Sequence, residues 1–396
     1  MSESKAEKPM FVLLFAGFGC FLLSFLGMGL GPWISLSATM EPPKEIADAN
    51  PYKDENGDKT DIGRGRETYI NEGCWHCHSQ FVRPVANEEF RYGPVSESWE
   101  SMYDVPNTFG TRRIGPDLSR EAGRRSNDWH YAHLWNPRST VPRSIMPKYP
   151  WMFEQDGETW KPSDKAKDLV AYLQYLGGAK KEEVRKMVWP SRVVTAGAPQ
   201  VTEAHGRRGK ALFEKHCIGC HGDKADGVGL AKDFLAPSAA DLTTRYLPRE
   251  EIFRVLFMGS EGSAMPSFSE LTEKDLWALA QYVHEFGKDV RGPALKTADN
   301  AAAVDRGRQA YINGGCKTCH GEDGLVPESM ESLQPAPKHF RDRLYSADYL
   351  KHVFEKGRPG TVMVPATGVK PADYDDLVAY LSSLFDRQKY KAEEDR

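Results

Sequence analysis

The sequence lacks the positive charge that nucleic-acid binding usually requires. Its 396 residues hold 52 lysines and arginines against 56 aspartates and glutamates, a formal net charge of −4. It also has little long apolar sequence, because only the run from Met10 to Leu30 has the roughly 20 apolar residues that a membrane-spanning helix needs. We therefore expect no nucleic acid as a partner, and no membrane domain with many spans.

The N-terminal apolar run predicts a membrane anchor over residues 1–40. It is longer than the apolar region of a typical secretory signal, and no small-residue cleavage site follows it. Lys5 and Lys8 precede the run, which favours a cytoplasmic N-terminus. The sequence thus predicts an uncleaved single-pass anchor in the inner (cytoplasmic) membrane, with the remaining chain on the periplasmic face.

Cysteine is also scarce, and its placement is informative. Six of the seven cysteines form three Cys-x-x-Cys pairs, each followed at once by histidine, which is the attachment motif of c-type haem. Thiols three residues apart on one helical turn share a face, so both can reach the vinyl groups of one haem. We predict three covalently bound haem c groups, attached by Cys74, Cys77, Cys217, Cys220, Cys316 and Cys319, with His78, His221 and His320 as iron ligands.

Paired cysteines can also hold zinc or form a redox dithiol. Zinc needs four ligands at one site, whereas these pairs lie far apart in the sequence, and a dithiol requires no histidine after its second cysteine. Three copies of the whole motif behind an export-type anchor favour haem.

The motifs lie in three segments that follow one plan, which predicts tandem domains. Each segment has a glycine- and arginine-rich helix start, the motif, a loop containing proline, a methionine, and a closing helix with apolar residues at three- and four-residue steps. We predict an all-α fold of three class I cytochrome c domains, with Thr272 as a helix N-cap, polar linkers, and a frayed tail after Arg387. The predicted domains are residues 60–179, 203–289 and 303–388.

A methionine occupies the corresponding place in each segment, and Met/His ligation is a cytochrome c arrangement. The predicted second iron ligands are Met146, Met265 and Met363, with Met152 and Met258 as local competitors. The histidine-to-methionine spacing is 44 and 43 residues in the second and third segments and 68 in the first, which indicates an insertion near residues 87–113. We expect the other histidine nitrogen to donate to a carbonyl in the proline loop.

With both axial positions filled, no iron would remain open to a substrate. We therefore predict electron transfer and no catalytic residues. A haem enzyme is the alternative, and it would need one iron able to bind an added ligand.

The first segment resembles a known family through several unusual short sequence motifs that occur in the same order. They are Gly73-Cys74-Trp75-His76-Cys77-His78-Ser79-Gln80, Arg83-Pro84, Gly115-Pro116-Asp117-Leu118, Asp128-Trp129-His130 and Ser144-Ile145-Met146-Pro147-Lys148-Tyr149-Pro150-Trp151. With the membrane helix, residues 10–178 resemble the mono-haem cytochrome c subunit (subunit II) of cbb3-type cytochrome c oxidases. The later segments match only general class I patterns.

The resemblance implies a relay of electrons to a separate haem–copper catalytic subunit of a terminal oxidase in aerobic respiration. It suggests that the insertion and residues 129–138 dock against that subunit. The family member ordinarily has one haem domain, so a chain with two more would also do the work of the di-haem subunit. The expected donor is a soluble or membrane protein such as a cytochrome c. A tri-haem subunit of a nitric oxide reductase or a dehydrogenase is the alternative.

Overall fold

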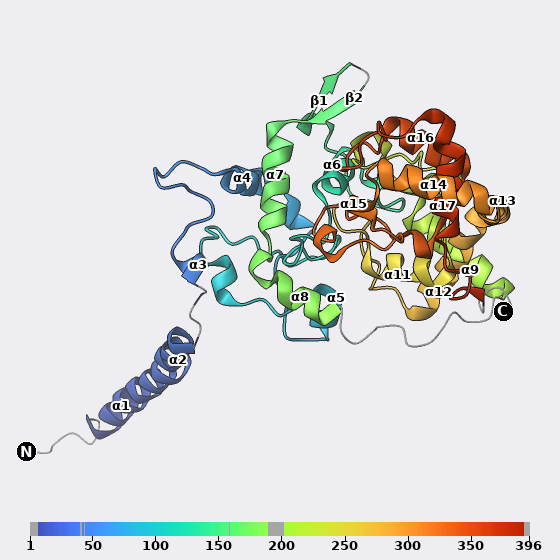
Figure 1. Cartoon of the computed structure of the whole chain (residues 1–396). Coiled ribbons are helices and arrows are strands. Elements are labelled where there is room, and N and C mark those ends of the chain that lie inside the picture. Colours follow the sequence, from blue (N-terminus) through green and yellow to red (C-terminus); the bar gives the residue numbers. More distant parts are fainter. Residues whose placement is uncertain (1–6, 40–41, 43, 158, 189–201, 392–396) are drawn as a thin grey trace, which may run out of the picture.

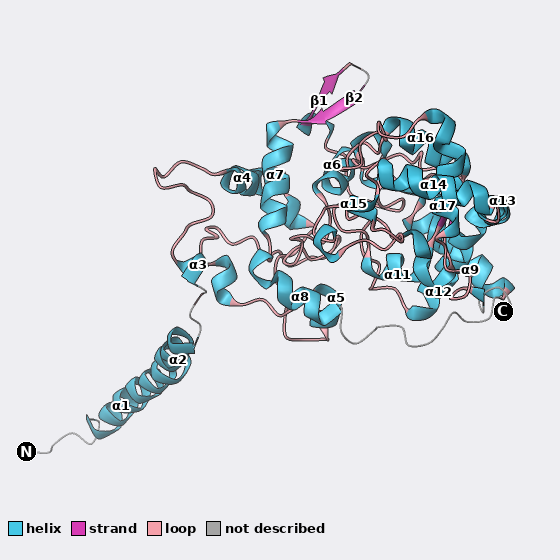
Figure 2. Cartoon of the chain, in the orientation of Figure 1, coloured by secondary structure: helices cyan, strands magenta, loops and turns pink. Residues whose placement is uncertain are grey.

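The computed structural model describes residues 7–39, 42, 44–157, 159–188 and 202–391. The described chain is mainly helical, with two short two-stranded sheets (Figure 2). This confirms the all-α prediction.

The predicted anchor is a separate helical rod. It consists of α1 (Glu7–Ser24), the π-helical turn η1 (Phe25–Leu30) and α2 (Gly31–Thr39), and it projects away from the rest of the protein (Figure 1). Within the described ranges, Met10–Ser35 is the one stretch of helix long and apolar enough to cross a membrane, and none of its most apolar window is buried.

The rest of the chain forms three helical domains, each built on the packing of its first helix against a closing helix near its end. In domain 1 (residues 61–188) these are α4 (Asp61–Asn71) and α7 (Asp164–Tyr175). In domain 2 (residues 203–287) they are α9 (Glu203–His216) and α12 (Glu273–His284). In domain 3 (residues 301–391) they are α14 (Ala301–Asn313) and α17 (Tyr374–Ser383).

The glycine- and arginine-rich helix starts are explained by these crossings. In each domain a glycine of the first helix lies against a backbone carbonyl oxygen of the closing helix. The two are so close that an added Cβ would overlap the oxygen. The Cβ-to-oxygen distances would be 1.9 Å for Gly65 and Asp168, 2.1 Å for Gly209 and Ala278, and 1.9 Å for Gly307 and Asp376. Glycine at these places lets the two backbones touch.

The arginine before each glycine makes a two-pronged ion pair across the same crossing, and an aromatic pair lies one turn later. The ion pairs are Arg64–Asp168, Arg208–Asp275 and Arg306–Asp376. The ring pairs are Tyr69–Tyr172, Phe213–Tyr282 and Tyr311–Tyr380, with centroids 5.4, 5.6 and 5.1 Å apart. The predicted N-cap is confirmed, since the Thr272 hydroxyl accepts from the Asp275 amide at 3.2 Å.

Domain 1 carries the predicted insertion, which folds as α5 (Glu88–Tyr92) and the 3-10 turn η3 (Ser98–Ser101). Glu88 holds the insertion against the rest of the domain, because its carboxylate forms ion pairs with both Arg83 and Arg113. A hairpin of β1 (Phe153–Asp156) and β2 (Thr159–Pro162) follows Met146. Apolar periodicity predicted helices and did not reveal this hairpin. The helix α8 (Lys181–Val188) ends the domain.

The prediction of a polar linker between domains 2 and 3 is wrong in one respect. Most of it is a helix, α13 (Lys288–Ala298), which packs against α17. Val290 and Ala294 are buried there with Tyr390, which is 3% exposed and donates its hydroxyl to Asp342. The expected fraying after Arg387 is therefore also wrong for the described residues, because this tail closes a small apolar core.

Domains 2 and 3 face each other with approximate two-fold symmetry. Strand β3 (Arg245–Tyr246) of domain 2 pairs antiparallel with β4 (Leu344–Tyr345) of domain 3. Gly262, in the methionine loop of domain 2, lies on the Gln334–Pro335 peptide of domain 3. Gly360, in the corresponding loop of domain 3, lies on the Ala236–Pro237 peptide of domain 2. Each domain thus covers the other's proline loop.

Candidate haem sites

The four predicted site residues of domain 2 lie around one cavity. Cys217 ends α9, and the short helix α10 (Ile218–His221) carries Cys220 and His221. Met265 comes from the loop after α11 (Arg249–Met258). All four line a cavity of about 390 Å³, whose other walls are mainly apolar side chains of the domain core.

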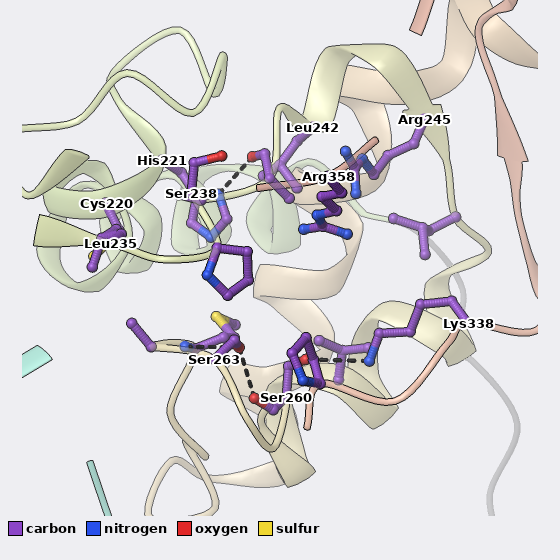
Figure 3. Close-up of a pocket in the computed structure, with 18 of the residues that line it drawn as sticks. Cys220, His221, Leu235, Ser238, Leu242, Arg245, Ser260, Ser263, Lys338 and Arg358 are labelled. Atoms are coloured by element: carbon purple, nitrogen blue, oxygen red, sulfur yellow. Dashed lines mark hydrogen bonds between the residues drawn. The ribbon is translucent and has the colours of Figure 1, made fainter. Parts of the chain in front are cut away.

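Domain 3 opens into the same cavity. Cys319 and His320, from α15 (Lys317–His320), and Met363, from the loop after α16 (Ala347–Lys356), line it from the opposite side. Cys316 packs against the core of domain 3. Figure 3 shows His221 and Cys220 of domain 2 facing Lys338 and Arg358 of domain 3 across this space. The two sites are therefore neighbours with a shared interior.

In domain 1, Cys74 and Met146 both contact the domain core. The His78 imidazole lies directly beside the backbone of Gly115, where an added Cβ would be 2.2 Å from the ring carbon Cε1. Glycine before Pro116 is thus required by the close approach of the ring.

The predicted histidine-to-carbonyl bonds form in two domains. His78 Nδ1 lies 2.8 Å from the carbonyl oxygen of Pro116, and His221 Nδ1 lies 2.9 Å from that of Ala240. His320 Nδ1 is buried without a partner in hydrogen-bonding geometry, although the backbone of Lys338 opposes the lowering of its pKa. A bond from Nδ1 leaves Nε2 free to bind iron.

Burial sets the protonation of these groups. It lowers the pKa of His78, His221 and His320, so that each ring is neutral, as metal binding requires. It raises the pKa of Cys217 to about 12 and that of Cys220 to about 11. Protonated thiols are poor zinc ligands and poor redox nucleophiles. Within the described ranges, no group of three or more His, Cys, Asp or Glu side chains could hold a metal ion. For the cysteine pair of domain 2, both findings disfavour the zinc and dithiol alternatives.

The three predicted methionines share one local turn. The Met146 amide donates to Ser144 at 3.2 Å, the Met265 amide to Ser263 at 3.3 Å, and the Met363 amide to Thr361 at 3.1 Å. Of the competitors, Met152 is fully buried in the core of domain 1 that Cys74 and Met146 also contact, whereas Met258 belongs to α11 beside Arg254.

Residues 129–138 contact domain 2. Trp129 lies on α6 (Asn127–Trp135), stacks on His133 with ring centroids 4.6 Å apart, and lines the shared cavity. An added Cβ on Gly219, between the two domain 2 cysteines, would lie 2.1 Å from the carbonyl oxygen of Ser139. Domain 2 therefore covers part of the segment that is expected to dock against a separate subunit, and docking of its remaining surface stays a prediction. Sequence alone did not reveal this contact.

His130, on α6, makes domain 1 sensitive to acid. Its ring is 4% exposed, and burial lowers its pKa from 6.5 to about 3, with His133 and Arg125 adding to the effect. The unfolded chain binds this proton below pH 6.5 and the folded chain does not, so stability falls as pH falls from 6.5 towards 3. We expect a loss of about 2 kcal/mol between pH 7 and pH 5 from this residue.

The measurement is denaturant unfolding of the detergent-solubilised chain at both pH values. His130→Asn should weaken the pH dependence of domain 1 and leave the part due to His133, whose pKa burial also lowers to about 3. His352→Asn, at an exposed position, should leave it unchanged. An unchanged slope in His130→Asn would show that another group titrates.

Three known protein families match successive parts of the chain. Residues 58–187 match the family described as cytochrome c oxidase, mono-haem subunit/FixO. Residues 204–283 match cytochrome c oxidase, cbb3-type, subunit III, and residues 304–385 match cytochrome c. The chain thus carries cytochrome c domains of these three kinds in order, and such domains imply covalently bound haem c.

Curated relatives point to the same type of complex. A cbb3-type cytochrome c oxidase subunit CcoP of Helicobacter pylori is 34% identical over 159 residues, which cover 39% of this chain and 48% of that protein. The CcoP subunit of another Helicobacter pylori strain is 29% identical over 167 residues, covering 39% and 49%. The chain spans about half the length of these relatives. Among solved structures, a chain of the Kuenenia stuttgartiensis reducing HAO-like protein complex is 22% identical, covers 48% of this chain and 100% of its own length, and has a TM-score of 0.23.

Proposed function

We propose that this protein is a membrane-anchored tri-haem cytochrome c that relays electrons to the catalytic subunit of a cbb3-type haem–copper oxidase in aerobic respiration. The observation that carries the proposal is the order of the matched families: a mono-haem oxidase subunit is followed in one chain by a cbb3 subunit III domain and a further cytochrome c domain. One polypeptide would supply the three c haems that this type of oxidase otherwise receives from two subunits.

The residues present fit three haems. Each domain has a cysteine pair, a histidine whose pKa is lowered by burial and a methionine-bearing loop, and those of domains 2 and 3 lie around a mainly apolar cavity. The proposed haem-attaching cysteines are Cys74, Cys77, Cys217, Cys220, Cys316 and Cys319, and the proposed iron ligands are His78, Met146, His221, Met265, His320 and Met363. Haem c supplies one-electron redox chemistry when bound. The chain's side chains position it and exclude water.

The arrangement of the domains supports an order of transfer. Domain 1 lies between the membrane helix and domains 2 and 3 in the sequence, and its turn η4 (Pro137–Ser139), which follows α6, contacts the haem motif of domain 2. Electrons from a cytochrome c or a similar donor would enter at domain 2 or 3 and leave from domain 1. The positive residues before the anchor, Lys5 and Lys8, favour the periplasmic face for the three domains.

Domain 1 also offers an apolar surface near its haem site. Trp75, which lies between Cys74 and Cys77, is 38% exposed, Ile145 beside Met146 is 76% exposed, and Ile114 beside Gly115 is 55% exposed. Phe90 and Val105 of the insertion are 79% and 83% exposed. Large apolar side chains exposed on one domain can mark an interaction site. We propose that this surface meets the oxidase catalytic subunit.

The test is gentle solubilisation of the membranes that contain this protein, followed by identification of what stays bound. A haem–copper subunit should co-purify with it. Recovery of a nitric oxide reductase or a dehydrogenase would replace the proposal with the corresponding complex. Carbon monoxide binding to the reduced protein would indicate an open iron and a haem enzyme.

Met146→Ala should lower the reduction potential of the domain 1 haem, because a methionine thioether as axial ligand raises the potential of a c-type haem. The measurement is a spectroscopic redox titration of the purified protein. Met258→Ala is the matched control and should leave all potentials in place. If Met146→Ala also leaves them in place, Met146 is not an iron ligand.

A further inference from the structure

The cavity shared by domains 2 and 3 is positively charged as well as apolar. Six lysine and arginine side chains line it, against one carboxylate, that of Glu270. Charges taken out of water need partners, and a buried group without one is costly. Positive charge gathered in an apolar cavity therefore indicates an anionic ligand.

The approximate symmetry of the two domains shows which cations lack a carboxylate partner. Arg343 of domain 3 reaches α11 of domain 2 and pairs there with buried Glu251. Arg245 of domain 2 reaches the corresponding place on α16 of domain 3, where it finds the ring of Tyr349, 4.9 Å away. Arg245 is only 7% exposed, and its Nε donates to the carbonyl oxygen of Asp241 at 2.8 Å. Among the described residues it makes no ion pair with a carboxylate.

Two cations of domain 3 complete the group. Lys338, in the proline loop, has the hydroxyl of Ser260 in domain 2 as its hydrogen-bond partner at 3.2 Å. Arg358, in the methionine loop, has no carboxylate partner within the part of the chain that the structure describes. Figure 3 shows the Arg358 guanidinium directed into the cavity, between Arg245 and Lys338. Burial and the nearby arginines lower the pKa of Lys338 to about 8, as expected for crowded positive groups.

We infer that Arg245, Lys338 and Arg358 form one shared binding site for the propionate carboxylates of the haems in domains 2 and 3. This inference rests on the proposed function, since it requires haem in both domains. Guanidinium groups bind carboxylates through paired hydrogen bonds, which a low-dielectric surrounding strengthens. Because Arg245 comes from domain 2 while Lys338 and Arg358 come from domain 3, the carboxylates would join the two domains and couple the two haems electrostatically.

The experiment is a redox titration of the full haem-loaded protein carrying Arg358→Ala. Loss of a cation beside a haem favours the oxidised iron, so two of the three haem potentials should shift downwards while that of domain 1 stays in place. Arg358→Lys, which keeps the charge, should lie near the wild type. Arg341→Ala removes one charge from an exposed site in the same domain and is the matched control.

Two outcomes would overturn the inference: no shift in Arg358→Ala, or an equal shift of all three potentials. If Arg358→Ala does not accumulate, redox-induced infrared difference spectra of wild type and Arg358→Lys, with isotope-labelled haem carboxylates, replace it. The labelled carboxylate bands should move between these two proteins, and identical bands would refute the site. Absence of covalent haem in the wild type would instead refute the proposed function.

Discussion

Replacing both Cys74 and Cys77 with serine should yield a protein with two covalent haems in place of three and with little electron delivery to its oxidase. Domain 1 is the proposed exit for electrons, so the haems of domains 2 and 3 could still be reduced but would have no near acceptor. Whole-protein mass spectrometry should show the loss of one haem, and oxygen consumption by the complex with an external donor should fall towards background.

The control for this double substitution is Cys20→Ser, which changes the unpaired cysteine on the membrane helix and should leave haem content and oxygen consumption unchanged. Oxygen consumption at the wild-type rate in a chain that lacks the domain 1 haem would contradict the proposed order of transfer. A mass that still includes three haems would contradict the attachment sites.

Gly209→Ala should destabilise domain 2 strongly. An alanine Cβ would lie 2.1 Å from the carbonyl oxygen of Ala278 and 2.7 Å from the Tyr282 Cβ, so helices α9 and α12 would have to separate. Forced overpacking of this kind costs about 1–3 kcal/mol or more. For a domain of this size, each kcal/mol lowers Tm by roughly 4–8 °C. Thermal unfolding followed through haem absorbance measures the change.

Gly206 provides a control in the same helix. Nothing lies within 4 Å of an added Cβ there, so Gly206→Ala removes only the conformational freedom of glycine and should stabilise α9 by up to about 1 kcal/mol. Equal effects of the two substitutions would show that helix propensity, and not contact between α9 and α12, decides the result.

Much of each haem site could be predicted from the sequence because its parts repeat. The cysteine pair and the adjacent histidine lie within one helical turn, so their geometry is local. The methionines are distant from the motif, but their common place in three segments identified them, and the shared turn around Met146, Met265 and Met363 agrees with that choice. The ligands themselves remain proposals.

The elements that sequence reasoning missed depend on contacts between segments. Helix α13 has a polar composition that indicates a linker, yet it buries Val290 and Ala294 because a partner surface from both domains lies beside it. In the β1–β2 hairpin only Phe153 among the strand residues is fully buried, so the hairpin has no apolar face that the sequence would reveal. Neither partner surface nor exposure can be read from a local pattern.

By itself, the sequence determined the number and order of the cytochrome c domains, the likeness of the first to an oxidase subunit, the apolar N-terminal helix and the residues proposed to hold haem. All of these are encoded in short motifs, their spacing or one continuous run. Only the tertiary structure decided that the turn η4 of domain 1 lies on the haem motif of domain 2, and that domains 2 and 3 share a cavity lined by several cations and one carboxylate. The physical reason is that contacts between domains depend on how folded surfaces match in shape and charge, and side chains such as Arg245 and Arg358 acquire a common role only when two domains bring them together.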